Sequence, residues 1–288
     1  MGELIVMKLV NTVPELKRVL DLFRQEGRPI GFVPTMGALH EGHLSLVRSA
    51  EGKGCCVVVS IFVNPTQFND LRDLERYPRT LSPDLLLLEK TSCEVVFAPA
   101  VSEIYPEPDL RIFHFGQLDQ VMEGASRPGH FNGVAQVVSR LFELVRPDLA
   151  FFGEKDFQQL AIVRAMVKQL ELPVEIVGCP IVREPDGLAM SSRNTLLSPE
   201  QRISASRISR ALLSLQEKAG SKPLPVLLAE VRTWIDEDPL LKTEYLEVVD
   251  AETLQSVNSL DYPSALQVCV AVKVGSIRLI DNLCIKAS

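Results

Sequence analysis

Two histidines three residues apart form the pattern in this chain that most clearly suggests chemistry. His40 and His43 lie in the segment PTMGALHEGH (34–43), and the whole chain has only four histidines. An apolar run precedes the segment and a helical pattern follows it. A strand-to-helix turn of this kind presents backbone N–H groups and imidazoles to one side, which suits a phosphate group. The pattern predicts a nucleotide ligand, against the plainer alternative of two surface or core histidines.

Three further polar segments stand where a phosphate or a polar substrate could bind. Phe152–Gln159 lies at the end of an apolar run and carries Lys155, a point charge for phosphate. Met190–Asn194 places two hydroxyl groups beside Arg193, which makes a compact anion clamp. Asn64–Phe68 follows another apolar run. Taken alone, the first segment is more typical of a capped helix and the second of an ordinary polar loop.

The elements that must position these segments alternate between short apolar runs and helical patterns. Strands are expected at 5–10, 29–33, 56–63, 94–97, 149–152 and 174–177. Helices are expected at 13–25, 43–51, 81–90, 134–145 and 156–170, with Asn132-Gly133 opening the fourth. Strands that are apolar on both faces and alternate with helices predict a Rossmann-like, doubly wound parallel sheet. The carboxyl ends of such strands line the ligand crevice, so three of the four polar segments should converge there.

The pattern changes after about residue 182, where a loop rich in Pro, Gly and Ser begins. Helices are expected at 199–219 and 224–236, and strands at 244–249, 267–274 and 278–284. Gly275-Ser276 between the last two strands predicts a hairpin. The chain is therefore expected to contain a catalytic domain over 1–182 and a smaller α+β domain over 183–288.

Composition and charge narrow the class of protein. The chain has 288 residues, of which 46% are hydrophobic and 23% charged, as in a soluble globular protein. Its net charge of −7 disfavours nucleic acid and anionic membranes as partners, so anionic substrates need a local basic cluster. Six cysteines without C-x-x-C spacing argue against a zinc site and for a reducing, cytoplasmic location. The N-terminus reads as a strand rather than a signal peptide, and no apolar run is long enough to cross a membrane.

Five segments together resemble the signature blocks of the pantothenate synthetase family, in the same order. They are PTMGALHEGH, IFVNPTQF, RPGHFNGV, FFGEKDFQQL and VREPDGLAMSSRN, and RLIDNLCI near the C-terminus resembles the family's closing strand. The family is similar to class I aminoacyl-tRNA synthetases in a HIGH-like turn, here His40 to His43, and a KMSKS-like loop, here Met190 to Arg193. Phe157 stands where many members have Tyr.

The resemblance implies an ATP-dependent ligase that joins pantoate to β-alanine through a pantoyl adenylate and releases AMP and pyrophosphate. It implies Mg²⁺ on the ATP phosphates, a homodimer, and catalytic roles for His43, His40, Lys155 and Arg193. It assigns pantoate to Gln159, and both pantoate and β-alanine to Gln67. The ATP-binding residues that it implies are Met36, Gly37, Ala38, Leu39, His40, Glu41, Gly42, His43, Gly153, Glu154, Lys155, Asp156, Val182, Met190, Ser191, Ser192 and Arg193.

Four other residues are candidates for the second substrate or for shaping the site, namely Asn64, Tyr77, Arg127 and His130. The loop at 183–194 and the C-terminal domain are expected to act as a lid, because water would hydrolyse the adenylate. Two alternatives stay open at this point. One is a nucleotidyltransferase that passes AMP to a phosphate acceptor, which would need a basic acceptor pocket. The other is a non-catalytic protein that binds nucleotides.

Overall fold

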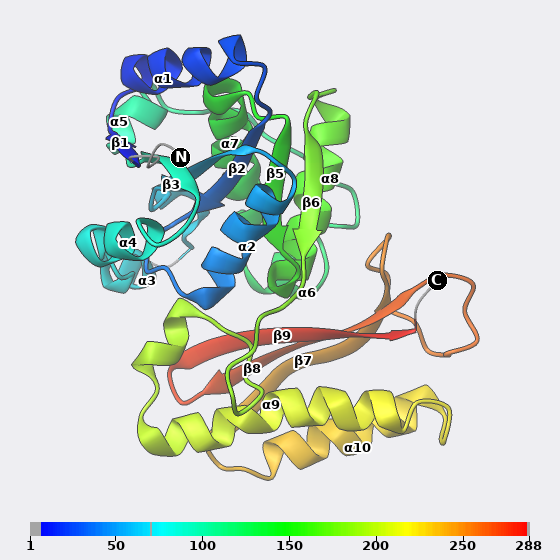
Figure 1. Ribbon diagram of the computed structural model, residues 1–288. Coiled ribbons are helices and arrows are strands. Elements are labelled where there is room, and N and C mark those ends of the chain that lie inside the picture. Colours follow the sequence, from blue (N-terminus) through cyan, green and yellow to red (C-terminus); the bar gives the residue numbers. More distant parts are fainter. Residues whose placement is uncertain (1–6, 70, 287–288) are drawn as a thin grey trace. The chain divides into compact units, whose positions relative to one another are not determined.

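The computed structural model describes residues 7–69 and 71–286 (Figure 1). The chain forms two compact units. The first contains the residues through Phe115 together with Gly124–Glu154 and Gln159–Pro180. The second contains the chain from Ile181 onward and also takes two short segments, Gly116–Glu123 and Lys155–Gln158. No helix within the described ranges is long and apolar enough to cross a membrane.

The first unit is built on a parallel sheet, which has six strands in the described part of the chain. They are β1 (Lys8–Val10), β2 (Ile30–Thr35), β3 (Cys56–Ile61), β4 (Cys93–Phe97), β5 (Leu149–Gly153) and β6 (Glu175–Cys179). Their order is β1-β4-β3-β2-β5-β6, so the winding reverses between β2 and β5 (Figure 1). The doubly wound parallel sheet predicted from the sequence is confirmed, and open sheets of this kind bind ligands at the point of reversal.

Helices cover both faces of this sheet because its strands are apolar on both sides. The helices of this part of the chain are α1 (Val13–Gln25), α2 (Glu41–Gly52), α3 (Leu71–Arg76), α4 (Leu81–Leu88), α5 (Val101–Ile104), α6 (Met122–Ser126), α7 (His130–Val145) and α8 (Phe157–Gln169). Val33 of β2 joins a core cluster with Val47 of α2. Phe32, which must point to the opposite face, meets Phe142 of α7 edge-on at 6.3 Å between ring centroids.

Most element boundaries lie close to those predicted, whereas the short helices α3, α5 and α6 were not predicted. Thr12 caps α1 and forms a capping box with Glu15, so that helix has the expected bounds. Residues 5 and 6 of the first expected strand lie outside the described residues. Of the helix predicted at 156–170, residue 156 belongs to a 3-10 turn, η2 (Glu154–Asp156), and α8 begins one residue later.

Helix α7 begins earlier than predicted, and the reason is a close approach of two segments. Gly129 adopts φ 81° at the N-cap, so the helix starts at His130 and Asn132-Gly133 lie inside it. The prediction that they open the helix is wrong. A Cβ on Gly133 would lie 2.4 Å from the carbonyl oxygen of Thr66, which belongs to the 3-10 turn η1 (Pro65–Gln67). Glycine is needed there to let the turn pass against the helix.

The second unit contains an antiparallel sheet of β7 (Leu241–Asp250), β8 (Leu266–Val274) and β9 (Ile277–Lys286). Helices α9 (Pro199–Glu217) and α10 (Leu224–Asp236) share its apolar core. β8 and β9 form the predicted hairpin, with Gly275 at φ 60°. The assignment of residues 1–182 and 183–288 to a catalytic and a lid domain stays a prediction.

Two buried groups tie the segment 116–123 into the second unit. Arg278 of β9 makes two 2.7 Å bonds to the carboxylate of Glu123, which also accepts from the Tyr245 hydroxyl at 2.8 Å. The side-chain amide of Gln158 donates to the carbonyls of Leu118 and Val121 and accepts from the Glu123 N–H. Sequence patterns gave no signal for these long-range contacts.

The close approach at Gly133 generates a prediction for stability. Gly133→Ala should lower the free energy of unfolding by about 1–3 kcal/mol, because the new methyl group overlaps the backbone of Thr66 and Gln67. Gly52→Ala is the matched control, since a Cβ at that helical glycine meets no atom within 4 Å. Urea denaturation of both variants checks this. An unchanged midpoint for Gly133→Ala would show that η1 yields freely.

Candidate active site

The turn from β2 into α2 is held by a buried carboxylate. Gly37 and Ala38 adopt positive φ values of 85° and 51°. Asp84 of α4, which is 1% exposed, accepts the Ala38 N–H at 3.0 Å and the Leu39 N–H at 2.8 Å. Thr80 donates its hydroxyl to the same carboxylate. Asp84 was missed in the sequence because it sits in an apolar helix pattern far along the chain.

The contacts of this turn decide which of its groups can meet a ligand. The Gly37 N–H donates to the Thr35 hydroxyl at 3.2 Å, and the N–H groups of Ala38 and Leu39 point at Asp84. The sequence suggested that backbone N–H groups of the turn hold phosphate. These three already donate to protein acceptors within the structure.

His40 and His43 cap α2 through their own side chains. The Nδ1 atom of His40 accepts from the Gly42 N–H at 3.2 Å, and the Nδ1 atom of His43 accepts from the His40 N–H at 3.3 Å. Their ring centroids are 4.1 Å apart. A neutral imidazole that accepts at Nδ1 carries its proton on Nε2. The capping box therefore fixes the tautomer of both rings and makes each Nε2–H a donor.

Gln67 lies beside two residues from neighbouring strand ends. Its amide nitrogen is 3.2 Å from the sulfur of Met36, and its amide oxygen accepts from Asn64 at 3.3 Å. Met36 follows β2, and Asn64 and Gln67 follow β3, which pairs with β2 in the sheet. The structure thus brings together three residues that the sequence placed at the carboxyl ends of strands.

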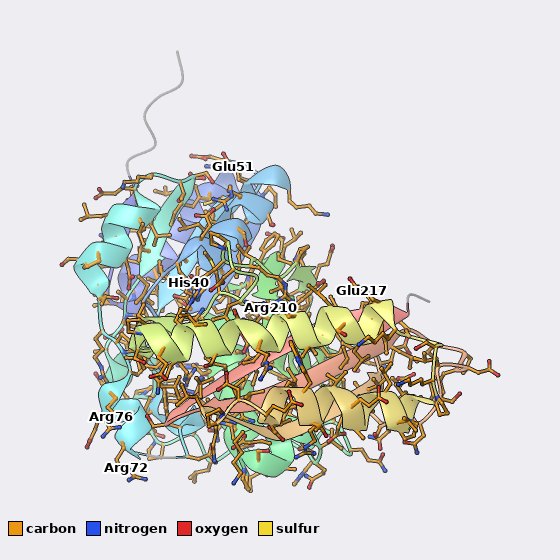
Figure 2. The ribbon with its side chains drawn as sticks, turned by 90° about the horizontal axis from the view of Figure 1, so that it is seen from below. His40, Glu51, Arg72, Arg76, Arg210 and Glu217 are labelled. Atoms are coloured by element: carbon orange, nitrogen blue, oxygen red, sulfur yellow. The ribbon has the colours of Figure 1, made fainter. Side chains whose placement is uncertain are left out.

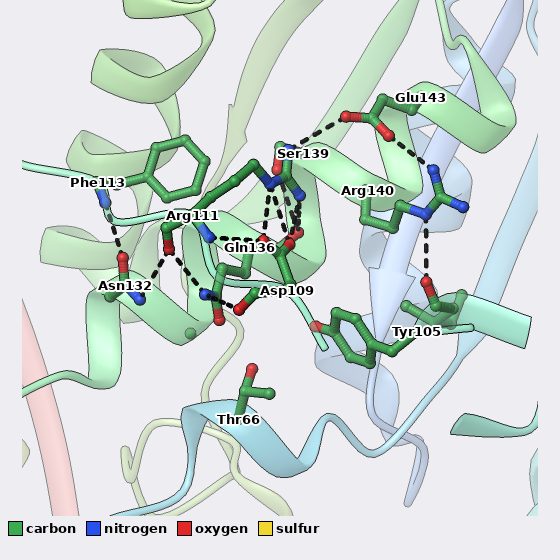
Figure 3. Close-up of polar contacts among 12 residues, drawn as sticks. Thr66, Tyr105, Asp109, Arg111, Phe113, Asn132, Gln136, Ser139, Arg140 and Glu143 are labelled. Carbon is green, nitrogen blue, oxygen red and sulfur yellow. Dashed lines mark hydrogen bonds and ion pairs between the residues drawn. The ribbon is translucent and has the colours of Figure 1, made fainter. Parts of the chain in front are cut away.

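Asn64 is fully used within the protein. Its amide nitrogen also donates to the Gly133 carbonyl at 3.1 Å, and its oxygen accepts from the hydroxyls of Thr66 and Tyr105. Burial raises the pKa of Tyr105, which keeps that hydroxyl a donor. Figure 3 shows the side chains of Thr66 and Tyr105. Asn64 is 1% exposed, so its place is in shaping the site.

His130 and Arg127 support the backbone of Gln67. An arginine can only donate, so its 3.2 Å contact with Nε2 of His130 places the His130 proton on Nδ1. That N–H donates to the Gln67 carbonyl at 2.8 Å. His130 is buried, and Tyr77 packs edge-on against Phe68. His130 thus holds the backbone of Gln67, and Tyr77 lies against the residue that follows Gln67.

Beyond β5, two adjacent glutamines differ in their surroundings. Gln158 is 5% exposed, and its side-chain amide makes three hydrogen bonds to the backbone of the segment 118–123. Gln159 is half-buried, and its amide makes no hydrogen bond within the described part of the chain. A Cβ on Gly153 would meet no atom within 4 Å, so the backbone at the end of β5 stands open. Gln159 therefore has the unused donors and acceptor that a substrate needs.

Lys155, Asp156, Val182 and the segment Met190–Arg193 belong to the second unit. Lys155 is half-buried, and its Nζ lies 4.0 Å from the carboxylate of Asp156. Ser191 caps a 3-10 turn, η3 (Ser192–Leu196), and accepts the Arg193 N–H at 3.3 Å. The sequence expected hydroxyl groups beside Arg193, and this turn places them together.

A short hairpin leads into Met190. The Met190 N–H donates to the Val182 carbonyl at 3.0 Å, and Gly187 turns the chain at φ 90°. Glu184 accepts from Arg202 and from Asn194. Burial alone would raise the pKa of Glu184, but these hydrogen bonds outweigh it and lower the pKa. The root of the segment is thereby braced by a charged network.

The nearest arginines along the chain after η1 lie on a short helix of mixed charge. Helix α3, which follows η1 in the chain, carries Arg72 and Arg76 one turn apart. Both are exposed, and Figure 2 shows them projecting from the same short helix. The sequence of the same helix also contains Asp73 and Glu75, which balance these two charges, so α3 by itself supplies no net positive charge for an anionic substrate.

Comparison with known proteins decides the family. The family model for pantoate-beta-alanine ligase matches residues 8–284. The chain belongs to the pantoate–β-alanine ligase family. It is 52% identical to the pantothenate synthetase of Bacteroides fragilis over 98% of this chain and 100% of that protein. It is 55% identical to that of Phocaeicola vulgatus over 96% of this chain and 99% of that protein.

Solved structures agree. The crystal structure of pantothenate synthetase from Thermus thermophilus is similar with a TM-score of 0.91 and 46% identity, over 97% of this chain and 99% of that one. A pantoate-beta-alanine ligase from Francisella tularensis, complexed with beta-gamma ATP and beta-alanine, is similar with a TM-score of 0.82 and 33% identity, over 98% and 99%. The chain is thus a ligase of a family that condenses pantoate with β-alanine.

The Asp84 contact generates a prediction for the turn. Asp84→Asn keeps the shape of the side chain but leaves one acceptor oxygen for two N–H groups, which should lower the free energy of unfolding by about 1–3 kcal/mol. The amide protons of Ala38 and Leu39 should exchange faster with solvent in this variant. Thr80→Val is the control, because it removes only the hydroxyl bond. If both variants exchange alike at these two amides, the carboxylate does not hold the turn.

Proposed function

We propose that this protein activates pantoate with ATP as a pantoyl adenylate and transfers the pantoyl group to β-alanine, releasing AMP and pyrophosphate. The observation that carries the proposal is the end of β2, where two imidazoles with Nε2 protons share one edge of the sheet with the neutral amide of Gln67. Imidazole donors suit phosphate oxygens. The Francisella ligase crystallised with an ATP compound and β-alanine supports ATP use by this chain.

The chemistry explains why ATP is needed. A carboxylate does not acylate an amine directly, because its oxygen is a poor leaving group. One carboxylate oxygen of pantoate attacks the α-phosphorus, the bond to the bridging oxygen breaks, and pyrophosphate leaves. The amine of β-alanine then attacks the acyl carbon, loses a proton, and displaces AMP. Positioning and charge stabilisation dominate in both steps.

Within this scheme, each group takes the role that its chemistry allows. His40 and His43 donate their Nε2 protons to phosphate oxygens as charge builds on them. Lys155 and Arg193 add positive charge at the phosphates, with hydroxyl donors from Ser191 and Ser192. The remaining ATP contacts are those implied by the family resemblance: Met36, Gly37, Ala38, Leu39, Glu41, Gly42, Gly153, Glu154, Asp156, Val182 and Met190.

Neutral amides suit the other substrate. Gln159 and Gln67 can orient the hydroxyls and carboxylate of pantoate without neutralising the nucleophile, and Gln67 also serves β-alanine. Mg²⁺ fits as a companion of ATP, because it prefers phosphate and water oxygens and the groups proposed here are mainly hydrogen-bond donors. It would neutralise charge on the departing pyrophosphate. The cytoplasm is the proposed location, because the cysteines of the described residues are free thiols, as in a reducing compartment.

One assay separates this function from the two alternatives. The protein is incubated with ATP, Mg²⁺ and pantoate, with and without β-alanine, and AMP, ADP and pyrophosphate are measured. We expect AMP and pyrophosphate in equal amounts, with multiple turnovers only when β-alanine is present. ADP with orthophosphate would exclude adenylation. If ATP is consumed only after a phosphorylated acceptor is added, the nucleotidyltransferase is favoured. If ATP is not consumed under any of these conditions, a non-catalytic binding protein is favoured.

The double role of His43 can be dissected by substitution. The side-chain oxygen of Asn stands near the position of Nδ1, so His43→Asn should keep the cap on the His40 N–H while removing the Nε2 donor. We expect adenylate formation to slow by about 10²–10³-fold in both His43→Asn and His43→Ala. Only His43→Ala should also lose stability. Single-turnover kinetics with urea denaturation measures both, and a normal first step in His43→Asn would contradict the role.

The neighbouring glutamines make a matched pair. Gln159→Ala should weaken pantoate use, raising its KM by about tenfold or more, since one hydrogen bond to a charged group contributes about 1.5–3 kcal/mol. Its ATP affinity and stability should be nearly normal. Gln158→Ala should instead lower stability, because it leaves the Glu123 N–H and two carbonyls without their partner. Calorimetry measures both affinities. If Gln159→Ala lowers the affinity for ATP as much as the affinity for pantoate, the assignment of Gln159 to pantoate is refuted.

A homodimer is proposed with residues 109–113 at its contact. Side chains of α7 bind the carbonyls of Asp109 and Arg111 and the Phe113 N–H, a spacing of two that marks one edge of an extended segment (Figure 3). Leu110 and Ile112 alternate with them and are 86% and 74% exposed. Such apolar exposure is typical of an interface.

Sedimentation should detect the effect of changing that contact. We expect a dimer for the unmodified protein and a monomer for the double variant Leu110→Ser with Ile112→Ser. Ile203→Ser is the control, because Ile203 of α9 is 75% exposed but lies elsewhere in the chain. A dimer that survives the double variant would move the contact to another surface.

A further inference from the structure

Two consecutive polar residues of β9 are buried although they belong to a strand of the second unit. Asp281 and Asn282 are each 3% exposed. Burying a carboxylate and an amide is costly unless both are well bonded, so their partners show why the fold keeps them. Those partners lie in two distant parts of the chain, at Lys155 and at Arg183.

Asn282 holds the backbone that presents Lys155. Its amide nitrogen donates to the Lys155 carbonyl at 2.9 Å. Its amide oxygen accepts from Gln267 of β8 at 2.6 Å, and Gln267 is itself buried. The amide oxygen of Asn282 therefore binds a neighbouring strand, and its NH₂ group binds the backbone of η2. The bond acts on the main chain and leaves the ammonium group of Lys155 uninvolved.

Asp281 holds the root of the hairpin that leads to Met190–Arg193. Arg183 binds both carboxylate oxygens, at 2.7 and 3.0 Å, and also donates to the Gly187 carbonyl at 3.1 Å. Arg183 pairs with Ala189 across the hairpin. A two-pronged arginine–carboxylate contact fixes orientation as well as distance. Because Met190 follows Ala189 directly, this contact sets where the segment Met190–Arg193 begins.

The two contacts are also joined to each other. The Asn282 N–H donates to Asp281 at 2.8 Å, and Arg183 donates to the Asn282 carbonyl at 3.3 Å. We propose that Asp281 and Asn282 are positioning residues that set the spacing between Lys155 and the segment Met190–Arg193 through the backbone. The inference rests on the proposed function, in which both segments bind the ATP phosphates. Neither residue is a catalytic residue.

Kinetics of the first half-reaction test the inference. Asn282→Ala and Asp281→Asn should each slow adenylate formation by about 10- to 100-fold, since misplacement of about 1 Å can cost that much. The KM for pantoate should change little. When Lys155 is already replaced by Ala, Asn282→Ala should slow adenylate formation by less than about a further threefold. When Arg193 is already replaced by Ala, Asp281→Asn should have an equally small further effect on the rate. The reason is that the effects of coupled residues are not additive. Full multiplicative losses in both cycles would overturn the inference.

Controls separate positioning from loss of stability. Leu227→Ala removes a core side chain of α10 in the second unit, and it should slow adenylation much less at comparable loss of stability. Lys222→Ala, at an exposed ion pair, should have no effect. Should Asn282→Ala fail to fold, Gln267→Leu gives the milder variant, with a smaller loss in the same direction. If Leu227→Ala slows adenylate formation as much as Asn282→Ala does, Asp281 and Asn282 have only a structural role.

Hydrogen exchange tests the same link without turnover. In the ligand-free protein, Asp281→Asn should speed exchange of the Met190 and Glu184 amides, which donate within the hairpin. Unchanged exchange at both amides would overturn the link between Asp281 and the hairpin. An unmodified protein that forms no AMP would refute the proposed function instead, and the exchange result would still stand.

Discussion

The site depends on a buried carboxylate that accepts two consecutive backbone N–H groups. A non-glycine residue at positive φ, as Ala38 is in this turn, is strained, and the N–H groups of the turn would each cost about 1–3 kcal/mol if buried without acceptors. Asp84 removes that penalty for Ala38 and Leu39. The chain can then leave β2 sharply enough for His40 to stand at the first position before α2. Everything that the histidines do follows from this placement.

The histidines themselves serve two purposes with different atoms. Nδ1 of each ring completes the cap of α2, which a Ser or Thr with a Glu usually does. Nε2 of each ring is thereby committed as a donor. An ordinary capping box would stabilise the helix equally well but would offer no donor to a phosphate. The use of histidine at both cap positions is intelligible only when structure and ligand are considered together.

The sequence predicted those parts of the molecule that depend on local pattern. The doubly wound sheet followed from apolar runs between helical patterns, and the polar segments after β2, β3 and β5 were recognisable by type. What sequence could not predict depends on contacts between distant residues. Asp84 looks like one more charge on a helix, and Gln158 looks interchangeable with Gln159. The start of α7 was misplaced because Gly133 does not end or begin a helix here. It allows the backbone of Thr66, a residue 67 positions earlier in the chain, to pass close to α7.

A single distinction separates residues that build this site from those proposed to act in it. Asn64, Gln158 and Asp84 are buried and have their hydrogen-bonding capacity filled by protein partners. Gln159 keeps unused capacity, and the contact of Gln67 with the Met36 sulfur is one that a stronger acceptor can replace. A filled group cannot bind substrate without breaking the fold around it. Gln159 directly follows the filled Gln158, and Gln67 lies three residues after the filled Asn64 and accepts a hydrogen bond from it. Rigid neighbours of this kind let a flexible amide side chain hold one orientation.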